Sequence, residues 1–225
     1  MKFKSIAIDG PSGAGKSTLA RRAAEALGFL YVDTGAIYRT LGLFAARNGA
    51  DPGDIRAVMP LLSRVSLRLD HGPDGLQHMY LGGEDVTEAI RRPEVSRYAS
   101  AISAHPEVRA FLMDMQRDLA KAYNVVMDGR DIGTVVLPGA DMKIFLTASP
   151  EARARRRCAE LAARGTLQDY DTVLAEIVER DRRDTTRETA PLRQAEDAVV
   201  VDTTVLSLEQ SAEALLAAIR RKLEL

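Results

Sequence analysis

The stretch Gly10-Pro-Ser-Gly-Ala-Gly-Lys-Ser17 decides the fold of this chain. It matches the phosphate-loop pattern G-x-x-x-x-G-K-S/T in full, and it stands between an apolar run, 6–8, and a helical segment. Glycines let the N–H groups of such a loop face a phosphate, and the helix N-terminus adds partial positive charge. Lys16 of the pattern reaches the β- and γ-phosphates, and the Ser17 hydroxyl ligates Mg²⁺. The motif therefore predicts a site for a nucleoside triphosphate with Mg²⁺.

Short apolar runs alternate with helical stretches along the whole chain. Strands spaced by helices predict parallel crossovers, and runs that are apolar throughout predict strands covered on both faces. We therefore expect an α/β fold with a five-stranded parallel sheet flanked by helices. The runs are 6–8, 30–32, 125–127, 142–146 and 198–201. The polar residues that follow them, and that we expect at the ligand-binding carboxyl edge of the sheet, are Asp9, Asp33, Asp128, Thr147 and Asp202.

Caps and periodicity predict four helices and one insertion. Period-two alternation within 64–81, around the turn Gly72-Pro-Asp-Gly75, predicts an antiparallel hairpin inserted at about 63–92. The remainder, 1–62 and 93–225, is expected to form the core of a single domain over 1–225. The helices are predicted over 17–27, 150–164, 167–182 and 207–223.

The composition excludes several classes of protein. Lysine plus arginine total 31 and aspartate plus glutamate 32, so the strong basic excess of a general nucleic-acid binder is missing. No apolar run approaches the ~20 residues of a membrane span, and the N-terminus leads directly into a strand-like run rather than an export signal. A single cysteine, Cys158, excludes an intramolecular disulfide and fits a reducing compartment. We expect a cytoplasmic monomer without nucleic-acid or membrane partners.

Asp128, at the end of an apolar strand, is the expected companion of the phosphate loop, holding Mg²⁺ directly or through water. Asp9 competes with it for this role.

Arginine outnumbers lysine 25 to 6, and arginine makes planar, bidentate phosphate contacts that lysine does not. Arginines gather after strand ends, in 153–157 and in 180–187, although part of the first run is expected to be only a solvated helix face.

A phosphate loop also serves switches and motors. A guanine-specific switch needs an Asn-Lys-x-Asp segment, and neither Asn48 nor Asn124 precedes a lysine. This disfavours the switch class, and the other main class is a small-molecule kinase with an arginine-rich helical lid, here about 153–187. The pattern alone leaves open a kinase for another acceptor, such as UMP, and a regulatory protein that binds ATP without transferring phosphate.

Several segments together resemble the bacterial cytidylate kinase family, a branch of the nucleoside monophosphate kinases. The resemblance runs from the first strand to the last helix. It implies transfer of the γ-phosphate of ATP to CMP or dCMP, with Mg²⁺, in the cytoplasm. The segments are Asp9-Gly-Pro-Ser-Gly-Ala-Gly-Lys-Ser-Thr18, Asp33-Thr-Gly-Ala-Ile-Tyr-Arg39, Gly83-Glu-Asp-Val86, Asp128-Gly-Arg-Asp-Ile-Gly-Thr134 and Arg180-Asp-Arg-Arg-Asp-Thr-Thr-Arg187.

The resemblance also implies roles for single residues. Those implied for CMP are Thr34, Arg109 and Asp131 at cytosine, Ser100, Arg180 and Asp184 at the sugar, and Arg39, Arg130 and Arg187 at the acceptor phosphate. Those implied for the ATP phosphates are Gly10, Pro11, Ser12, Gly13, Ala14, Gly15, Lys16, Ser17, Thr18, Arg156 and Arg157. The expected catalytic group is Lys16, Arg130, Arg187 and Asp128. Ser100 and Arg109 rest on the resemblance alone, because they sit in helical segments with no local motif.

Overall fold

The computed structural model describes residues 3–72, 75–163 and 165–224. The predicted turn residues Pro73 and Asp74, and the predicted helix end Arg164, lie outside the described residues. The chain divides into two compact units, Met1–Leu30 with Tyr123–Leu225, and Tyr31–Ala122. The second unit contains the predicted insertion but extends well beyond it, and the single-domain organisation stays a prediction.

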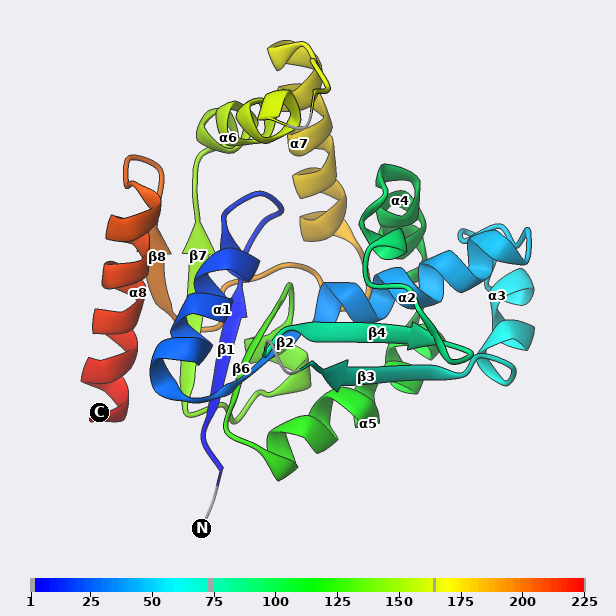
Figure 1. The fold of residues 1–225 in the computed structure, drawn as a ribbon, viewed down its shortest axis with the longest axis horizontal. Helices are drawn as coiled ribbons and strands as arrows, with labels where there is room; N and C mark the ends of the chain where they lie inside the picture. Colours follow the sequence, from blue (N-terminus) through cyan, green and yellow to red (C-terminus); the bar gives the residue numbers. More distant parts are fainter. Residues whose placement is uncertain (1–2, 73–74, 164, 225) are drawn as a thin grey trace. The chain divides into compact units, whose positions relative to one another are not determined.

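A parallel five-stranded sheet carries the phosphate loop, as the sequence predicts (Figure 1). The central strand β1 pairs in parallel with β6 and with β7. Ile6, Ala7 and Ile8 of β1 are completely buried, because both faces of a parallel sheet are covered. In spatial order the strands are β2 (Leu30–Asp33), β6 (Val125–Gly129), β1 (Ser5–Asp9), β7 (Met142–Thr147) and β8 (Val199–Asp202).

The helices of the first unit follow their predicted caps, with one exception. Helix α1 (Lys16–Leu27) ends at the left-handed Gly28, and α8 (Leu208–Leu223) begins at a capping box formed by Ser207 and Gln210. Helix α6 (Pro150–Ala163) extends from the end of β7, beside α7 (Figure 1).

The predicted helix over 167–182 has the wrong bounds. Helix α7 runs over Tyr170–Thr186. It begins there because the Asp169 carboxylate accepts a hydrogen bond from the Thr172 N–H, which caps the first turn. Its longer C-terminal end places Asp184 on the helix rather than after it.

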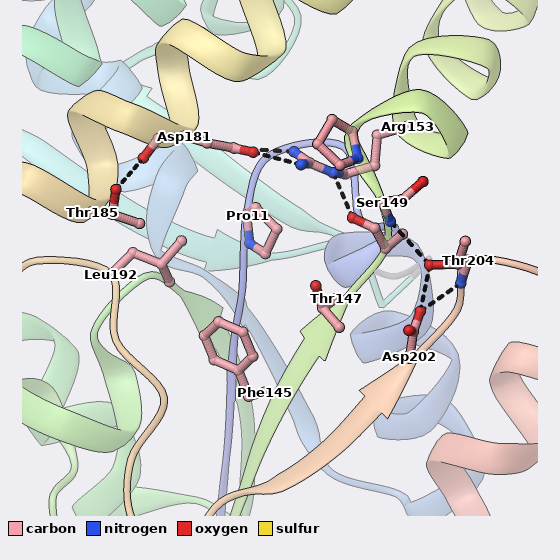
Figure 2. Close-up of a pocket in the computed structure, with 12 residues that line it drawn as sticks. Pro11, Phe145, Thr147, Ser149, Arg153, Asp181, Thr185, Leu192, Asp202 and Thr204 are labelled. Atoms are coloured by element: carbon pink, nitrogen blue, oxygen red, sulfur yellow. Dashed lines mark hydrogen bonds and ion pairs between the residues drawn. The ribbon is translucent and has the colours of Figure 1, made fainter.

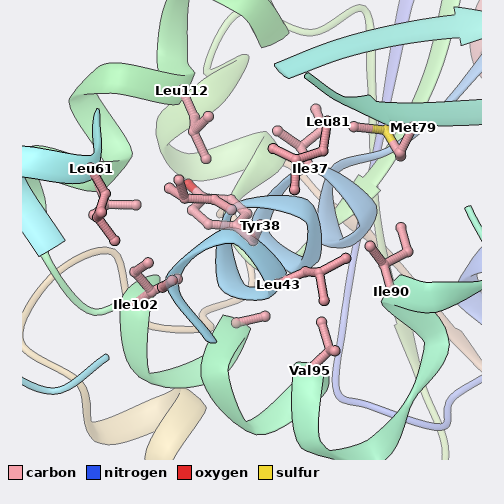
Figure 3. Packing of buried hydrophobic residues seen from close by; sticks show 14 of the residues in the cluster. Ile37, Tyr38, Leu43, Leu61, Met79, Leu81, Ile90, Val95, Ile102 and Leu112 are labelled. Carbon is pink, nitrogen blue, oxygen red and sulfur yellow. The ribbon is translucent and has the colours of Figure 1, made fainter. Parts of the chain in front are cut away.

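The second unit packs helices around an apolar cluster (Figure 3). Tyr38 lies in this cluster among Leu61, Ile102 and Leu112. The helices are α2 (Thr34–Arg47), α3 (Ile55–Leu62), the short 3₁₀ helix η1 (Ala89–Arg91), α4 (Pro93–Ile102) and α5 (Pro106–Ala122).

The predicted hairpin is confirmed in the second unit. Strands β3 (Leu67–His71) and β4 (Gln77–Leu81) pair antiparallel, with His71 opposite Gln77. A short third strand, β5 (Glu84–Asp85), for which the sequence pattern gives no signal, pairs with β4. Among the described residues, no helix is both long and apolar enough to cross a membrane.

Candidate active site

The phosphate loop follows β1 without a break, and its backbone requires glycine. Gly10 has a φ of 151°, and a Cβ placed on it would lie 1.9 Å from the backbone oxygen of Leu146 on the neighbouring strand. Gly15, with a φ of 87°, stands immediately before α1 as its N-cap. The loop therefore presses against β7 while it presents its N–H groups at a helix N-terminus.

Lys16 is buried at the start of α1, and its ammonium donates a hydrogen bond to the Pro11 carbonyl at 2.7 Å. Burial, together with the positive charge of Arg130, lowers the pKa of Lys16 to about 7, against the attraction of Asp128. A triphosphate in the loop would supply the negative charge that favours the protonated lysine.

The two residues predicted to hold Mg²⁺ lie together. The Ser17 hydroxyl donates a hydrogen bond at 3.1 Å to the carboxylate of Asp128, which lies on β6. A hydroxyl and a carboxylate supply the hard oxygen ligands that Mg²⁺ prefers, so these residues suit the ion.

The competing candidate for that role, Asp9, is engaged elsewhere. Its two carboxylate oxygens accept hydrogen bonds from the N–H groups of Ile132 and Gly133, each at 2.7 Å. These residues open a short π-helix, η2 (Ile132–Val136), that follows β6. Asp9 therefore holds the backbone directly after Asp131, and the geometry favours Asp128 at the metal.

Asp9 also predicts a pH dependence of stability. Burial raises the pKa of Asp9 from 3.8 to about 6, although its two backbone hydrogen bonds lower it. A carboxyl group with a raised pKa binds its proton more tightly in the folded state. Its contribution to stability is therefore present below about pH 4 and lost as the pH rises through about 6.

We expect the wild type to lose about 2–3 kcal/mol of unfolding free energy between pH 4 and pH 7 relative to Asp9→Asn. The measurement is urea unfolding of both proteins at the two pH values. The variant keeps every other titrating group, so the difference between the two proteins isolates Asp9. A difference that does not change with pH would contradict the titration of this group.

Four predicted CMP-binding residues of the first unit form two ion pairs. Arg130 Nε donates to Asp184 Oδ2 at 2.8 Å, and Arg187 Nη2 lies 3.8 Å from Asp131 Oδ1. Burial opposes ionisation of Asp184, but the positive charges of Arg130, Arg180 and Arg187 outweigh it and hold its pKa below the usual value. Both carboxyl groups are buried, so these pairs fix the guanidinium groups in place.

Arg153 is a residue that the site prediction omitted. Its guanidinium, almost fully buried, donates to the Ser12 carbonyl of the phosphate loop at 3.0 Å and binds both oxygens of Asp181 on α7 (Figure 2). This contact ties the two lid helices to the loop. No local signal separates Arg153 from its arginine neighbours, because its burial depends on packing against α7.

The predicted ATP contacts Arg156 and Arg157 have protein partners in this structure. Arg156 donates to the Thr203 carbonyl and hydroxyl, and Arg157 pairs with Glu160 on the surface. Arg155 and Arg157 are exposed, as expected for a run that no single helix face can bury. A contact of Arg156 or Arg157 with ATP stays a prediction.

A pocket of about 380 Å³ lies beside the phosphate loop, at the carboxyl ends of β7 and β8 (Figure 2). Pro11 of the loop, Thr147 of β7 and Asp202 of β8 line it, together with Arg153 and Asp181. The sequence places Thr147 and Asp202 at this edge of the sheet, which is where open α/β sheets bind ligands.

Of the nine predicted CMP residues, Arg180 lies on α7 of the first unit, and the second unit holds four. Thr34 is buried at the start of α2, and Arg39 on the same helix pairs with Asp33 at 2.7 Å. Ser100 stands on α4, which packs against α2. Arg109 on α5 is buried, donates to the Ser103 carbonyl at 3.3 Å and lies over the Tyr38 ring at 5.6 Å.

The fold and the loop define a class of protein. A phosphate loop joins the central strand of a parallel sheet to its helix, a serine and an aspartate suit Mg²⁺, and two arginine-rich helices stand beside the loop. These features together define a kinase of the phosphate-loop class. A solved gluconokinase from Sinorhizobium meliloti 1021 has the same fold, with a TM-score of 0.50 at 19% sequence identity, covering 100% of this chain and 96% of that chain.

Sequence comparisons give the family. The cytidylate kinase family model matches residues 6–221. The cytidylate kinase of Caldicellulosiruptor bescii is 52% identical over 210 residues, covering 93% of this chain and 92% of that protein. The cytidylate kinase of an Exiguobacterium species is 51% identical over 214 residues, covering 95% of each. This chain belongs to the cytidylate kinase family, and it is a nucleoside monophosphate kinase.

Proposed function

We propose that this chain transfers the γ-phosphoryl group of ATP to CMP or dCMP and releases ADP with CDP or dCDP. Membership of the cytidylate kinase family supports the substrate. The observation that carries the chemistry is the phosphate loop with Lys16 beside the Ser17–Asp128 pair. The same unit holds the paired guanidinium groups of Arg130 and Arg187.

The donor half of the reaction belongs to the loop. Its N–H groups and Lys16 bind the β- and γ-phosphates, and Ser17 and Asp128 hold Mg²⁺, directly or through water. Bound Mg²⁺ supplies positive charge to the phosphate oxygens. Arg153 keeps the lid helices against the loop, and closure of the lid excludes water that would otherwise hydrolyse ATP.

The acceptor half needs positive charge rather than a base. A phosphate oxygen of CMP is already ionised, and it forms a bond to the γ-phosphorus while the bond from that phosphorus to the bridging oxygen of ADP breaks. The two phosphate groups repel each other, and Arg39, Arg130 and Arg187 offset this repulsion. Asp184 holds Arg130 in position before the substrate arrives, which reduces the reorganisation at the reaction step.

A coupled assay of ADP release tests the proposal, with ATP and Mg²⁺ and with CMP, dCMP, UMP or no acceptor. We expect rapid release with CMP and dCMP, and slow release with UMP or without an acceptor. Faster release with UMP than with CMP would favour the alternative that this kinase phosphorylates an acceptor other than CMP or dCMP. Binding of ATP without acceptor-dependent release would favour a regulatory protein.

Asp184→Ala should weaken the acceptor site and leave the ATP site nearly unchanged. Asp184 is proposed to accept a hydrogen bond from the sugar, and it also places Arg130. Hydrogen bonds to charged groups contribute about 1.5–3 kcal/mol, so we expect the KM for CMP to rise by about tenfold or more. The measurement is the KM for each substrate at saturation of the other.

Asp181→Ala is the matched control, one turn earlier on α7. Asp181 pairs with Arg153 at the phosphate loop instead of with Arg130. We expect this variant to affect the KM for ATP more than that for CMP. Equal losses at both sites in Asp184→Ala would show that Asp184 only maintains the fold of the lid.

A further inference from the structure

The inserted sheet, formed by β3, β4 and β5, contacts the end of β2 through one buried side chain. Gln77, the first residue of β4, accepts a hydrogen bond from the Asp33 N–H at 2.8 Å and donates one to the Asp33 carbonyl at 3.1 Å. The side-chain amide thus satisfies both backbone polar groups of a single residue. This residue stands where β2 ends and α2 begins.

A second contact comes from the same end of the hairpin. His71 lies opposite Gln77 in the register of β3 and β4, and its Nε2 donates to the Tyr31 carbonyl at 2.8 Å. The two residues hold alternate positions of β2, which restricts both the position and the direction of the strand end.

The Asp33 side chain carries this restraint to an arginine. Its Oδ1 accepts from the Ala36 N–H at 2.9 Å, which caps α2, and its Oδ2 accepts from Arg39 Nη2 at 2.7 Å. The guanidinium lies over Gly35, where an added Cβ would come within 2.9 Å of Arg39 Nη1. Displacement of the Asp33 backbone would therefore move the Arg39 guanidinium.

An amide at position 77 is not needed to fill the core. Gln77, Met79 and Leu81 share the buried face of β4, and the other two join the apolar cluster. An apolar side chain would cost less to bury than an amide, unless the amide makes its hydrogen bonds. The polar residue on this face is accounted for by its two bonds to Asp33.

We propose that Gln77 is a positioning residue for the acceptor phosphate: the inserted sheet fixes the β2–α2 turn, and Asp33 thereby holds Arg39 in place. The inference rests on the proposed function in one respect, the role of Arg39 at the phosphate of CMP. It assigns a task to the inserted sheet.

Gln77→Leu tests the proposal, since a leucine side chain has a volume similar to that of glutamine but makes no hydrogen bond to Asp33. We expect the KM for CMP to rise about tenfold, because a small misplacement of a phosphate-binding group is costly. The kcat and the KM for ATP should stay within about twofold of the wild type. Arg68→Ala is the control, because Arg68 on β3 is exposed, pairs with Asp70 and stacks on the Tyr80 ring. It should leave all three parameters unchanged.

A double-mutant cycle shows whether Gln77 acts through Arg39. In an Arg39→Ala background, Gln77→Leu should produce no further rise in the KM for CMP. Independent, additive losses would overturn the proposal, and so would equal losses in kcat and in both KM values. Thermal unfolding of each variant verifies that the fold persists.

A spectroscopic readout separates this inference from the proposed function. The side-chain Nε–H signal of Arg39 in the ¹⁵N NMR spectrum, assigned by its disappearance in Arg39→Ala, should shift and broaden in Gln77→Leu and stay unchanged in Arg68→Ala. An unchanged signal in Gln77→Leu overturns the positioning role whatever the substrate. A wild type that does not phosphorylate CMP overturns the proposed function alone.

Discussion

Lys16→Ala should abolish most phosphoryl transfer while the protein stays folded. Lys16 directs its ammonium into the phosphate loop, where the Pro11 carbonyl is its hydrogen-bond acceptor, and it is aimed at the migrating charge rather than at the apolar core. Loss of one contact that stabilises transition-state charge costs at least ~3 kcal/mol of barrier, or about a hundredfold in rate. The measurement is kcat with saturating ATP and CMP, together with thermal unfolding.

Lys143→Ala is the matched control for this experiment. Lys143 lies on β7 and pairs with Asp197 at 2.9 Å, away from the phosphate loop. The variant also removes one lysine charge from the first unit, and we expect near-normal turnover. Near-normal turnover in Lys16→Ala would refute the assignment of the loop as the ATP-phosphate site.

Asp131→Ala should narrow the preference for CMP over UMP. An ionised carboxylate accepts a hydrogen bond from the cytosine amino group but repels the uracil carbonyl at the same position. Unpaired buried polar groups cost about 1–3 kcal/mol each, and more when charged, so a preference of about a hundredfold in the wild type is expected. Asp131 is buried, which strengthens this discrimination. The measurement is the ratio of kcat/KM for the two acceptors.

The alternative role of Asp131 is to orient Arg187, which lies 3.8 Å away. That role predicts that activity on both bases falls together and that the ratio is unchanged. Asp131→Asn distinguishes the two roles further, because the asparagine amide has a similar shape but can also donate a hydrogen bond, for example to the uracil carbonyl. If Asp131 contacts the base, this variant should gain activity on UMP relative to CMP.

The phosphate loop, the parallel sheet and most helix ends could be predicted because their causes are local. Gly10 and Gly15 adopt backbone conformations that side chains rarely permit, so their spacing marks the loop in the sequence. The Ser207–Gln210 capping box and the left-handed Gly28 likewise involve residues within one turn. The pairing of Ser17 with Asp128 follows once the strand order is known, since both stand at the carboxyl edge of neighbouring elements.

The contacts that shape the site depend on residues far apart in the chain, and only the tertiary structure decided them. Asp9 was a rival metal ligand by sequence, and its two hydrogen bonds to a π-helix more than a hundred residues later gave it another task. In the sequence Arg153 does not differ from the arginines beside it, and only its contact with Asp181 on α7 distinguishes it. Gln77 carries no motif, because its partner is the backbone of Asp33, and a backbone group has no sequence signature. Burial and charge pairing of this kind follow from how distant elements pack, which local pattern does not encode.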